Sequence, residues 1–234
     1  MSERFFRKQV YQLGMFYQVN SSNPIFLDKT GELISKTEGK LKNWNGGIEG
    51  FQFSDDSELI SGKVNMDSYW YHYQKQGDFD DDSLGTFSKF VSETNEIISN
   101  VYQPTNFSRM GMRLQFILKK TSASVKEKYK HHFDTGFSSL KKYGVLSTAA
   151  IGFDIDNGEY NIKVNVNYAR RQTDIDKNAP KDGLLFDLDF SKSLNKIKLD
   201  GFTSLNKKFL AHVSSNYKDI ICCIAQEMGA INEG

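Results

Sequence analysis

The sequence has little cysteine, no long hydrophobic run and no excess of either charge. Its only cysteines are the neighbours Cys222 and Cys223, and 30 basic residues are balanced by 29 acidic ones. Adjacent cysteines rarely form a disulfide because the ring they would close is strained, so we expect a reduced, cytoplasmic protein. No apolar run approaches the roughly 20 residues of a transmembrane helix, and the charged N-terminus lacks the apolar core of a secretory signal. We therefore expect no membrane partner.

Catalytic motifs are missing as well. The chain has no Gly-x-Ser-x-Gly nucleophile motif, no Gly-x-Gly-x-x-Gly turn and no Gly-Lys-Ser/Thr phosphate loop. His131 and His132 would point about 100° apart on a helix and so would not reach one metal ion together. His72 and His212 stand at no ligand-like spacing. The sequence thus predicts no catalytic residue, no metal ligand set and no cofactor, and it favours a non-catalytic protein over an enzyme.

Composition nevertheless predicts a folded domain. Hydrophobic residues make up 38% of the chain and aromatic residues 13%, which is enough material for a core, and 234 residues fit a single domain over 1–234. The net charge of +1 gives no whole-chain field toward nucleic acid, although a local basic face stays open. Residues 21–47 are poor in apolar side chains and contain four glycines. We interpret them as a long loop or a small excursion that is free to move.

The stretch 109–119 alternates strictly between apolar and polar residues. Its apolar positions are Met110, Met112, Leu114, Phe116 and Leu118, and Arg109, Arg113, Gln115 and Lys119 lie between them. A period of two is typical of a strand with one buried and one solvated side.

Similar patterns predict the remaining elements. We expect further strands over 10–19, 48–53, 59–66, 146–156, 159–168 and 184–190, and helices over 83–101, 124–143 and 204–228. Asn157-Gly158 between two of the strands is a strong hairpin signal. The order predicts an α+β fold, a mostly antiparallel sheet with three helices packed on one face. Its two halves suggest a pseudo-repeat, but no residue-level self-similarity supports one.

The polar face of the predicted sheet is the best candidate surface. Arg109, Arg113, Asp187 and Asp189 are expected to fix the polar register of a bound partner. The pairs Asp154/Asp156 and Asp187/Asp189 each place two carboxylates on one side of a strand. Neighbouring Asp-bearing strands would crowd four carboxylates into a cation site. If the central strand lay between them, Arg113 would pair with the acids instead, and a solvated face with weak ion pairs is the third alternative.

An aromatic segment supplies candidate anchors. Tyr69, Trp70 and Tyr73 stand beside Tyr71 and His72. Such rings anchor protein interfaces or stack on planar ligands, and alternate rings can equally fill the core.

Several of these features occur in an order that resembles a known family. The Trp/Tyr segment is followed by a helix, the Arg-Met-Gly-Met-Arg-Leu strand over 109–114 and the Phe-Asp-Leu-Asp-Phe strand over 186–190. Over about residues 55–225 the chain resembles an uncharacterised family of bacterial proteins often found near mobile elements or phage-defence genes. It departs from that family early in the last helix, where Leu205 and Asn206 stand in place of a histidine. The resemblance transfers no catalytic residue and implies a non-catalytic defence or accessory subunit.

Three functional hypotheses follow. The leading one is a protein-binding or accessory subunit whose partner is another protein bound on the polar face. The resemblance implies a role in phage defence. The second is a nucleic-acid or nucleotide binder that uses basic side chains, namely Lys63, Arg109, Arg113, Lys119 and Lys163. The third is a metal-dependent phosphoesterase built on the two Asp pairs. The oligomeric state does not follow from the sequence.

Overall fold

The computed structural model describes residues 10–20, 26–37, 41–47, 50–54, 59–76, 81–119, 139, 142, 150–170 and 182–227. Its strands are β1 (Val10–Asn20), β2 (Lys42–Gly47), β3 (Gly50–Ser54), β4 (Ile60–Asn65), β5 (Ser68–Gln76), β6 (Asn106–Lys119), β7 (Ala150–Asp156), β8 (Asn161–Arg170) and β9 (Asp182–Ile197). Its helices are α1 (Phe26–Lys36), α2 (Asp81–Tyr102) and α4 (Leu199–Glu227).

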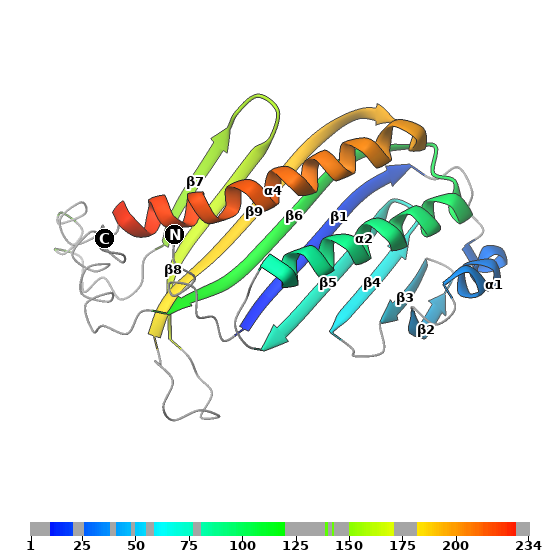
Figure 1. Ribbon diagram of the computed structural model, residues 1–234, viewed down its shortest axis with the longest axis horizontal. Coiled ribbons are helices and arrows are strands. Elements are labelled where there is room, and N and C mark those ends of the chain that lie inside the picture. Colours follow the sequence, from blue (N-terminus) through cyan, green and yellow to red (C-terminus); the bar gives the residue numbers. More distant parts are fainter. Residues whose placement is uncertain are drawn as a thin grey trace.

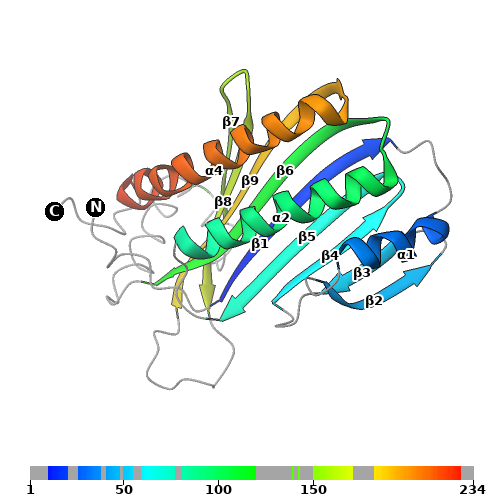
Figure 2. The same cartoon turned by 45° about the vertical axis from the view of Figure 1, so that its right-hand side comes forward.

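The nine described strands form one antiparallel sheet in the order β2-β3-β4-β5-β1-β6-β9-β8-β7. Helices α2 and α4 cross the same face of this sheet, and α1 lies at the end of that face over β2 and β3 (Figure 1, Figure 2). The described part of the chain is therefore α+β with three helices on one face, which confirms the predicted fold class. The two-half pseudo-repeat stays a prediction.

Helix α2 connects two strands that flank β1. Both β5 and β6 pair antiparallel with β1, so they run parallel to each other, and α2 carries the chain from one to the other across the sheet. A strand, a helix and a parallel strand in this order form a crossover connection. It puts the first strand of the chain at the centre of the sheet.

Side-chain alternation sorts every central strand into two faces. In β6 the residues Met110, Met112, Leu114 and Phe116 are at most 1% exposed and point toward the helices. Helix α4 packs on this face with a stripe of buried side chains that comprises Phe202, Phe209, Val213, Tyr217 and Ile221. Burying such side chains stabilises the fold by about 1.5–3 kcal/mol each before entropy is subtracted.

One buried hydrogen bond ties β1 to α4 through this apolar layer. The Tyr17 hydroxyl donates to Oδ1 of Asn206 over 2.9 Å, and both side chains are buried. Burial raises the pKa of Tyr17 far above its usual range, because its ionised form would lose its hydration. Asn206, which stands where the resemblance led us to look for a histidine, therefore has a structural partner in the core.

Parts of the secondary structure differ from the sequence prediction. The excursion over 21–47 contains helix α1 and strand β2. The aromatic segment is itself a strand, β5, and β9 continues to Ile197. The helix predicted over 124–143 lies, apart from residues 139 and 142, outside the described residues.

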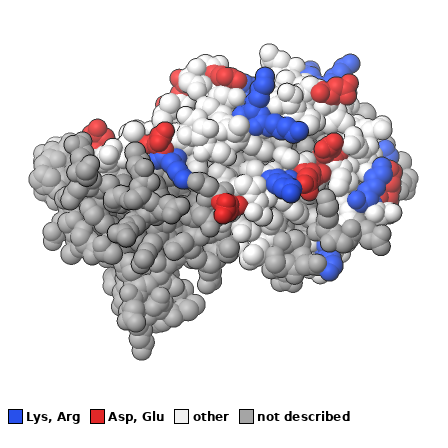
Figure 3. Space-filling view, viewed as in Figure 1, with Lys and Arg blue, Asp and Glu red and all other residues white. Residues whose placement is uncertain are grey.

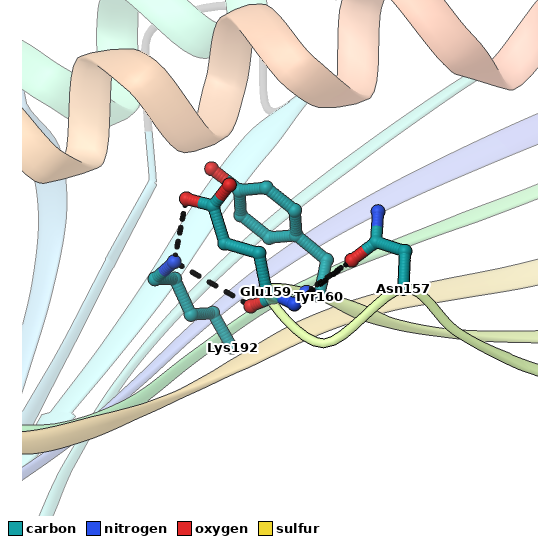
Figure 4. A network of polar contacts seen from close by, with 4 residues as sticks. All are labelled: Asn157, Glu159, Tyr160 and Lys192. Carbon is teal, nitrogen blue, oxygen red and sulfur yellow. Dashed lines mark hydrogen bonds and ion pairs between the residues drawn. The ribbon is translucent and has the colours of Figure 1, made fainter.

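The β7–β8 hairpin is confirmed, with a four-residue loop after Asp156. Asn157 Oδ1 accepts hydrogen bonds from the amides of Glu159 and Tyr160, over 3.0 and 2.7 Å. Gly158 takes a φ of +81°, a left-handed conformation that glycine adopts without strain. Lys192 of β9 reaches the loop from the neighbouring strand and contacts the Glu159 carboxylate at 2.8 Å (Figure 4). These contacts fix the hairpin end against the sheet.

Within the described residues, no helix is long and apolar enough to cross a membrane.

Gly62 is the position in β4 where a side chain would break the packing. A Cβ atom there would overlap the ring of Phe53, which is 2% exposed and lies over the glycine. We expect Gly62→Ala to lower the free energy of unfolding by about 1–3 kcal/mol, the usual cost of overpacking a core. Urea unfolding followed by circular dichroism measures it.

Gly85→Ala is the control, because a Cβ at this exposed position of α2 meets nothing within 4 Å. It should stabilise the protein by about 0.5–1 kcal/mol. Equal stability of the two variants would contradict the packing of Phe53 on Gly62.

Candidate functional site

The sheet face opposite the helices, called the open face here, carries the polar side chains of the alternating strands. A row of paired residues crosses it from β4 to β7: Ser61, His72, Gly14, Arg113, Asp189, Lys163 and Asp154. The last four members alternate in charge from strand to strand. Opposite charges across a ladder attract by about 0.2–1 kcal/mol per pair, so the row favours this strand order.

Arg113 and Asp187 form the strongest polar contact of the open face. The guanidinium donates from Nε to Asp187 Oδ1 over 2.8 Å and from Nη2 to Oδ2 over 2.6 Å. Gln115 donates to the same Oδ2 over 3.0 Å. The Asp187 side chain is only 17% exposed, whereas that of Arg113 is 59% exposed. The carboxylate thus holds one edge of the guanidinium and leaves the other edge open to solvent.

Asp189 lies next to Gly111 of β6, where the missing side chain leaves a gap on the open face. A Cβ atom on Gly111 would come within 3.7 Å of Asp189 Oδ1, so this carboxylate is close to the glycine backbone, and its register partner Arg113 bonds Asp187 instead. Burial raises the pKa of Asp189, although Arg109 and Arg113 oppose the shift. The gap therefore holds a carboxylate whose charge is incompletely compensated.

The four carboxylates do not meet. Strand β8 separates β9 from β7, and its Lys163 and Asn161 contact Asp154 at 3.9 and 2.6 Å. The sequence left two strand arrangements open, with the Asp-bearing strands as neighbours or with β6 between them. The structure has neither arrangement, yet Arg113 does pair with Asp187. Within the described residues no group of three His, Cys, Asp or Glu side chains is placed to hold a metal ion.

An aromatic pair lies beside the charged network. Trp70 of β5 and Phe16 of β1 are register partners, with ring centroids 4.3 Å apart. Trp70 is 50% exposed, the highest value among the exposed large hydrophobic side chains of the described residues. Lys63 of β4 is its neighbour on one side, and Gly111 is the neighbour of Phe16 on the other. The ring pair is therefore flanked by a cation and by the gap at Asp189.

A hollow of about 290 Å³ opens next to Lys63. Residues from β2, β3 and β4 line it, among them Asn45, Gly46, Gly47, Gln52, Lys63 and Asn65. Gly50 also borders it with a φ of +151°, and a Cβ there would overlap the carbonyl oxygen of Val64. The hollow offers amide groups and one cation together with the apolar surface of Phe51.

Two of the expected aromatic anchors are elsewhere. Tyr69 and Tyr73 are 0% and 6% exposed and point toward the helices, where Tyr73 stacks on Phe87. Their place in the core corrects the prediction that they anchor a partner, because a side chain without accessible surface has nothing to present. Trp70 alone keeps that role. Successive residues of a strand point to opposite faces, so the odd-numbered tyrosines and Trp70 cannot share one face.

The basic residues of the nucleic-acid hypothesis are dispersed. Arg113 is paired with Asp187, Lys163 lies 3.9 Å from Asp154, and Arg109 is four residues along β6 from Arg113. Lys63 lies on β4, which β5 and β1 separate from β6, and it is beside Trp70. The side chain of Lys119 is outside the described part of the structure.

Phe16 and the hollow were missed from sequence. Phe16 is an apolar residue between Gly14 and Gln18 on the polar side of β1, and this break in the alternation was the available signal. The hollow depends on how β2, β3 and β4 pair, and no local sequence pattern predicts it.

Comparisons with known proteins add little to this geometry. No family model matches the chain, and no match was found among the curated proteins. One match among solved structures is the substrate-free duplicated taurocyamine kinase from Schistosoma mansoni, with 10% identity and a TM-score of 0.34. The match covers 90% of this chain and 32% of the kinase chain. A likeness at this level carries no argument about fold or activity, and the family resemblance of the sequence stays a prediction.

The environment of Asp189 predicts a pH-dependent effect of its removal. Because its folded-state pKa is raised, the folded protein binds more protons than the unfolded chain near that pKa, and stability falls as the pH rises through this window. Asp189→Asn abolishes the loss. We expect the stability of the variant relative to the wild type to increase as the pH rises from about 3 to about 7. Urea unfolding at both pH values measures this increase. A gain that is equal at the two pH values would contradict the assignment.

Proposed function

We propose that the protein is a cytoplasmic, non-catalytic protein-binding or accessory subunit that receives another protein on its open face. The observation that carries the proposal is the half-exposed Trp70. Its ring packs against Phe16 with the centroids 4.3 Å apart, on the same face as the Arg113–Asp187 network and the hollow at Lys63. A rigid aromatic ring and a positioned guanidinium on one face are the combination in which interface energy concentrates.

The supports of these side chains favour binding without rearrangement. Phe16 holds the Trp70 ring, and two hydrogen bonds to Asp187 hold the guanidinium of Arg113. Immobilising a flexible side chain on binding costs about 0.5–1.5 kcal/mol of free energy, and side chains that are already ordered avoid part of this cost. The open face is thus a preorganised surface rather than a set of mobile charges.

The charge balance favours a protein partner over nucleic acid. The strand positions of the open face named above carry Lys63, Arg109, Arg113 and Lys163 against Asp154, Asp156, Asp187 and Asp189. The helix-covered side also mixes both signs in its described part (Figure 3). Nucleic-acid binding is driven largely by concentrated positive charge and counterion release, and mixed charges suit the polar rim of a protein interface. A role in phage defence rests on the family resemblance alone.

The proposal is tested by a pull-down from native lysate with a double variant, Arg113→Glu with Trp70→Ala. Because the variant removes the ring and reverses the charge, we expect it to lose the partners that the wild type retains, with affinity reduced about tenfold or more. Quantitative mass spectrometry of the retained proteins measures the loss.

Lys208→Glu is the control, because it makes the same change of charge at an exposed position of α4, on the helix-covered side. It should keep the partners. Partners that survive in the double variant would contradict the proposal. Binding to a mixed-sequence oligonucleotide that weakens steeply with salt would instead support the nucleic-acid hypothesis.

A further inference from the structure

Strand β7 ends the sheet with apolar side chains that the described helices leave exposed. Phe153 is 43% and Ile155 is 40% exposed, and Ile151 is half-buried. Their register partners in β8 are Val164, Ile162 and Val166, which belong to the core. The three β7 side chains therefore point to the helix side of the sheet. Helix α4 contacts the hairpin end, where His212 stacks on Tyr160, but it leaves Phe153 and Ile155 exposed.

We propose that β7 pairs with β7 of a second copy of this chain, antiparallel and centred on Phe153. This register places Phe153 opposite itself and Ile151 opposite Ile155 of the other copy. On the open face it places Asp154 opposite Gly152 and Asp156 opposite Ala150. Both faces are then complementary at once, since apolar side chains meet apolar ones and each acid meets a residue with almost no side chain.

Two of the neighbouring registers are worse by the same criteria. A shift by two in one direction puts Asp154 opposite Asp154 of the second copy, and like charges directly opposite each other are destabilising. A shift that changes the parity of the pairing sets Ile151 against Asp154 and mixes the two faces. The apolar positions of the segment 151–155 are thus symmetric about Phe153, through which a two-fold axis would pass.

The two edges of the sheet differ in a way that fits this assignment. At the other edge, the pairing of β2 with β3 is broken by an irregularity between Lys42 and Asn45, and Asn43 has a φ of +54°. Bulges of this kind protect an edge from pairing with another chain. Strand β7 instead pairs with β8 without interruption from Ala150 to Asp156, so its outer edge is regular.

The hairpin is also held in place for pairing. Lys192 contacts the Glu159 carboxylate at 2.8 Å and lies 4.4 Å from the ring centre of Tyr160, whose ring is stacked at 4.0 Å on His212 of α4 (Figure 4). Strand β7 is thereby fixed relative to β9 and α4. A two-fold pairing would join both sheets into one and keep both helix layers on the same side, a closed arrangement that stops at two copies.

Sedimentation equilibrium of the full chain tests the proposal. At about 100 µM we expect a species of twice the 26.7 kDa chain mass, and we expect Phe153→Asp to weaken self-association about tenfold or more, because it sets two carboxylates opposite each other. Trp70→Ala, on the open face, should leave the dimer intact. A wild type that stays monomeric at this concentration, or a Phe153→Asp variant that dimerises as the wild type does, would overturn the proposal.

Cross-linking tests the register without depending on affinity alone. In a Cys223→Ser background, which removes the exposed native thiol, Phe153→Cys should form an intermolecular disulfide under mild oxidation because position 153 faces itself. Asp154→Cys, one residue along, should not, because it faces position 152. Cross-linking of both variants to the same extent, or of Asp154→Cys alone, would exclude this register.

Discussion

The period of two along each strand is the constraint on which the rest of this structure depends. Because successive side chains of a strand point to opposite faces, the register of the nine strands determines both which side chains are buried and which are exposed to solvent. Met112 and Phe190 pair beneath the helices, and one residue along, Arg113 and Asp189 pair on the open face. A slip by one residue would exchange the core with the charged face, so packing and candidate surface are fixed by the same pairing.

The open face combines features that oppose and support stability. Asp187 is well compensated by two donors from Arg113 and one from Gln115. Asp189 is half-buried beside Gly111 with a raised pKa, and Trp70 keeps half of its surface in water. A surface chosen for stability alone would avoid both of the last two features. Both lie on the same face, separated by Phe16 of β1 and Gly111 of β6, and this is the physical reason to regard the face as a binding surface.

Much of the sheet could be predicted from the sequence, because alternation and the Asn157-Gly158 turn are local signals. Strand β5 escaped prediction since aromatic residues occupy both of its faces, and helix α1 escaped because few of its residues are apolar. The strand order depends on contacts far apart in sequence, such as the pairing of β1 with β6, and it decides which charges meet. The pairing of Arg113 with an acid was one of the alternatives considered, and the gap at Gly111 was not.

The most direct test is the accessibility of Trp70 to a quencher. The chain has two tryptophans, and Trp44→Phe would leave Trp70 as the only emitter while keeping an aromatic ring against Phe51 and Phe53. A two-sided sheet with a free open face predicts emission typical of a hydrated indole and efficient quenching by iodide, reduced when a partner binds. Blue-shifted emission that iodide does not quench in the isolated protein would show a covered face and contradict the account.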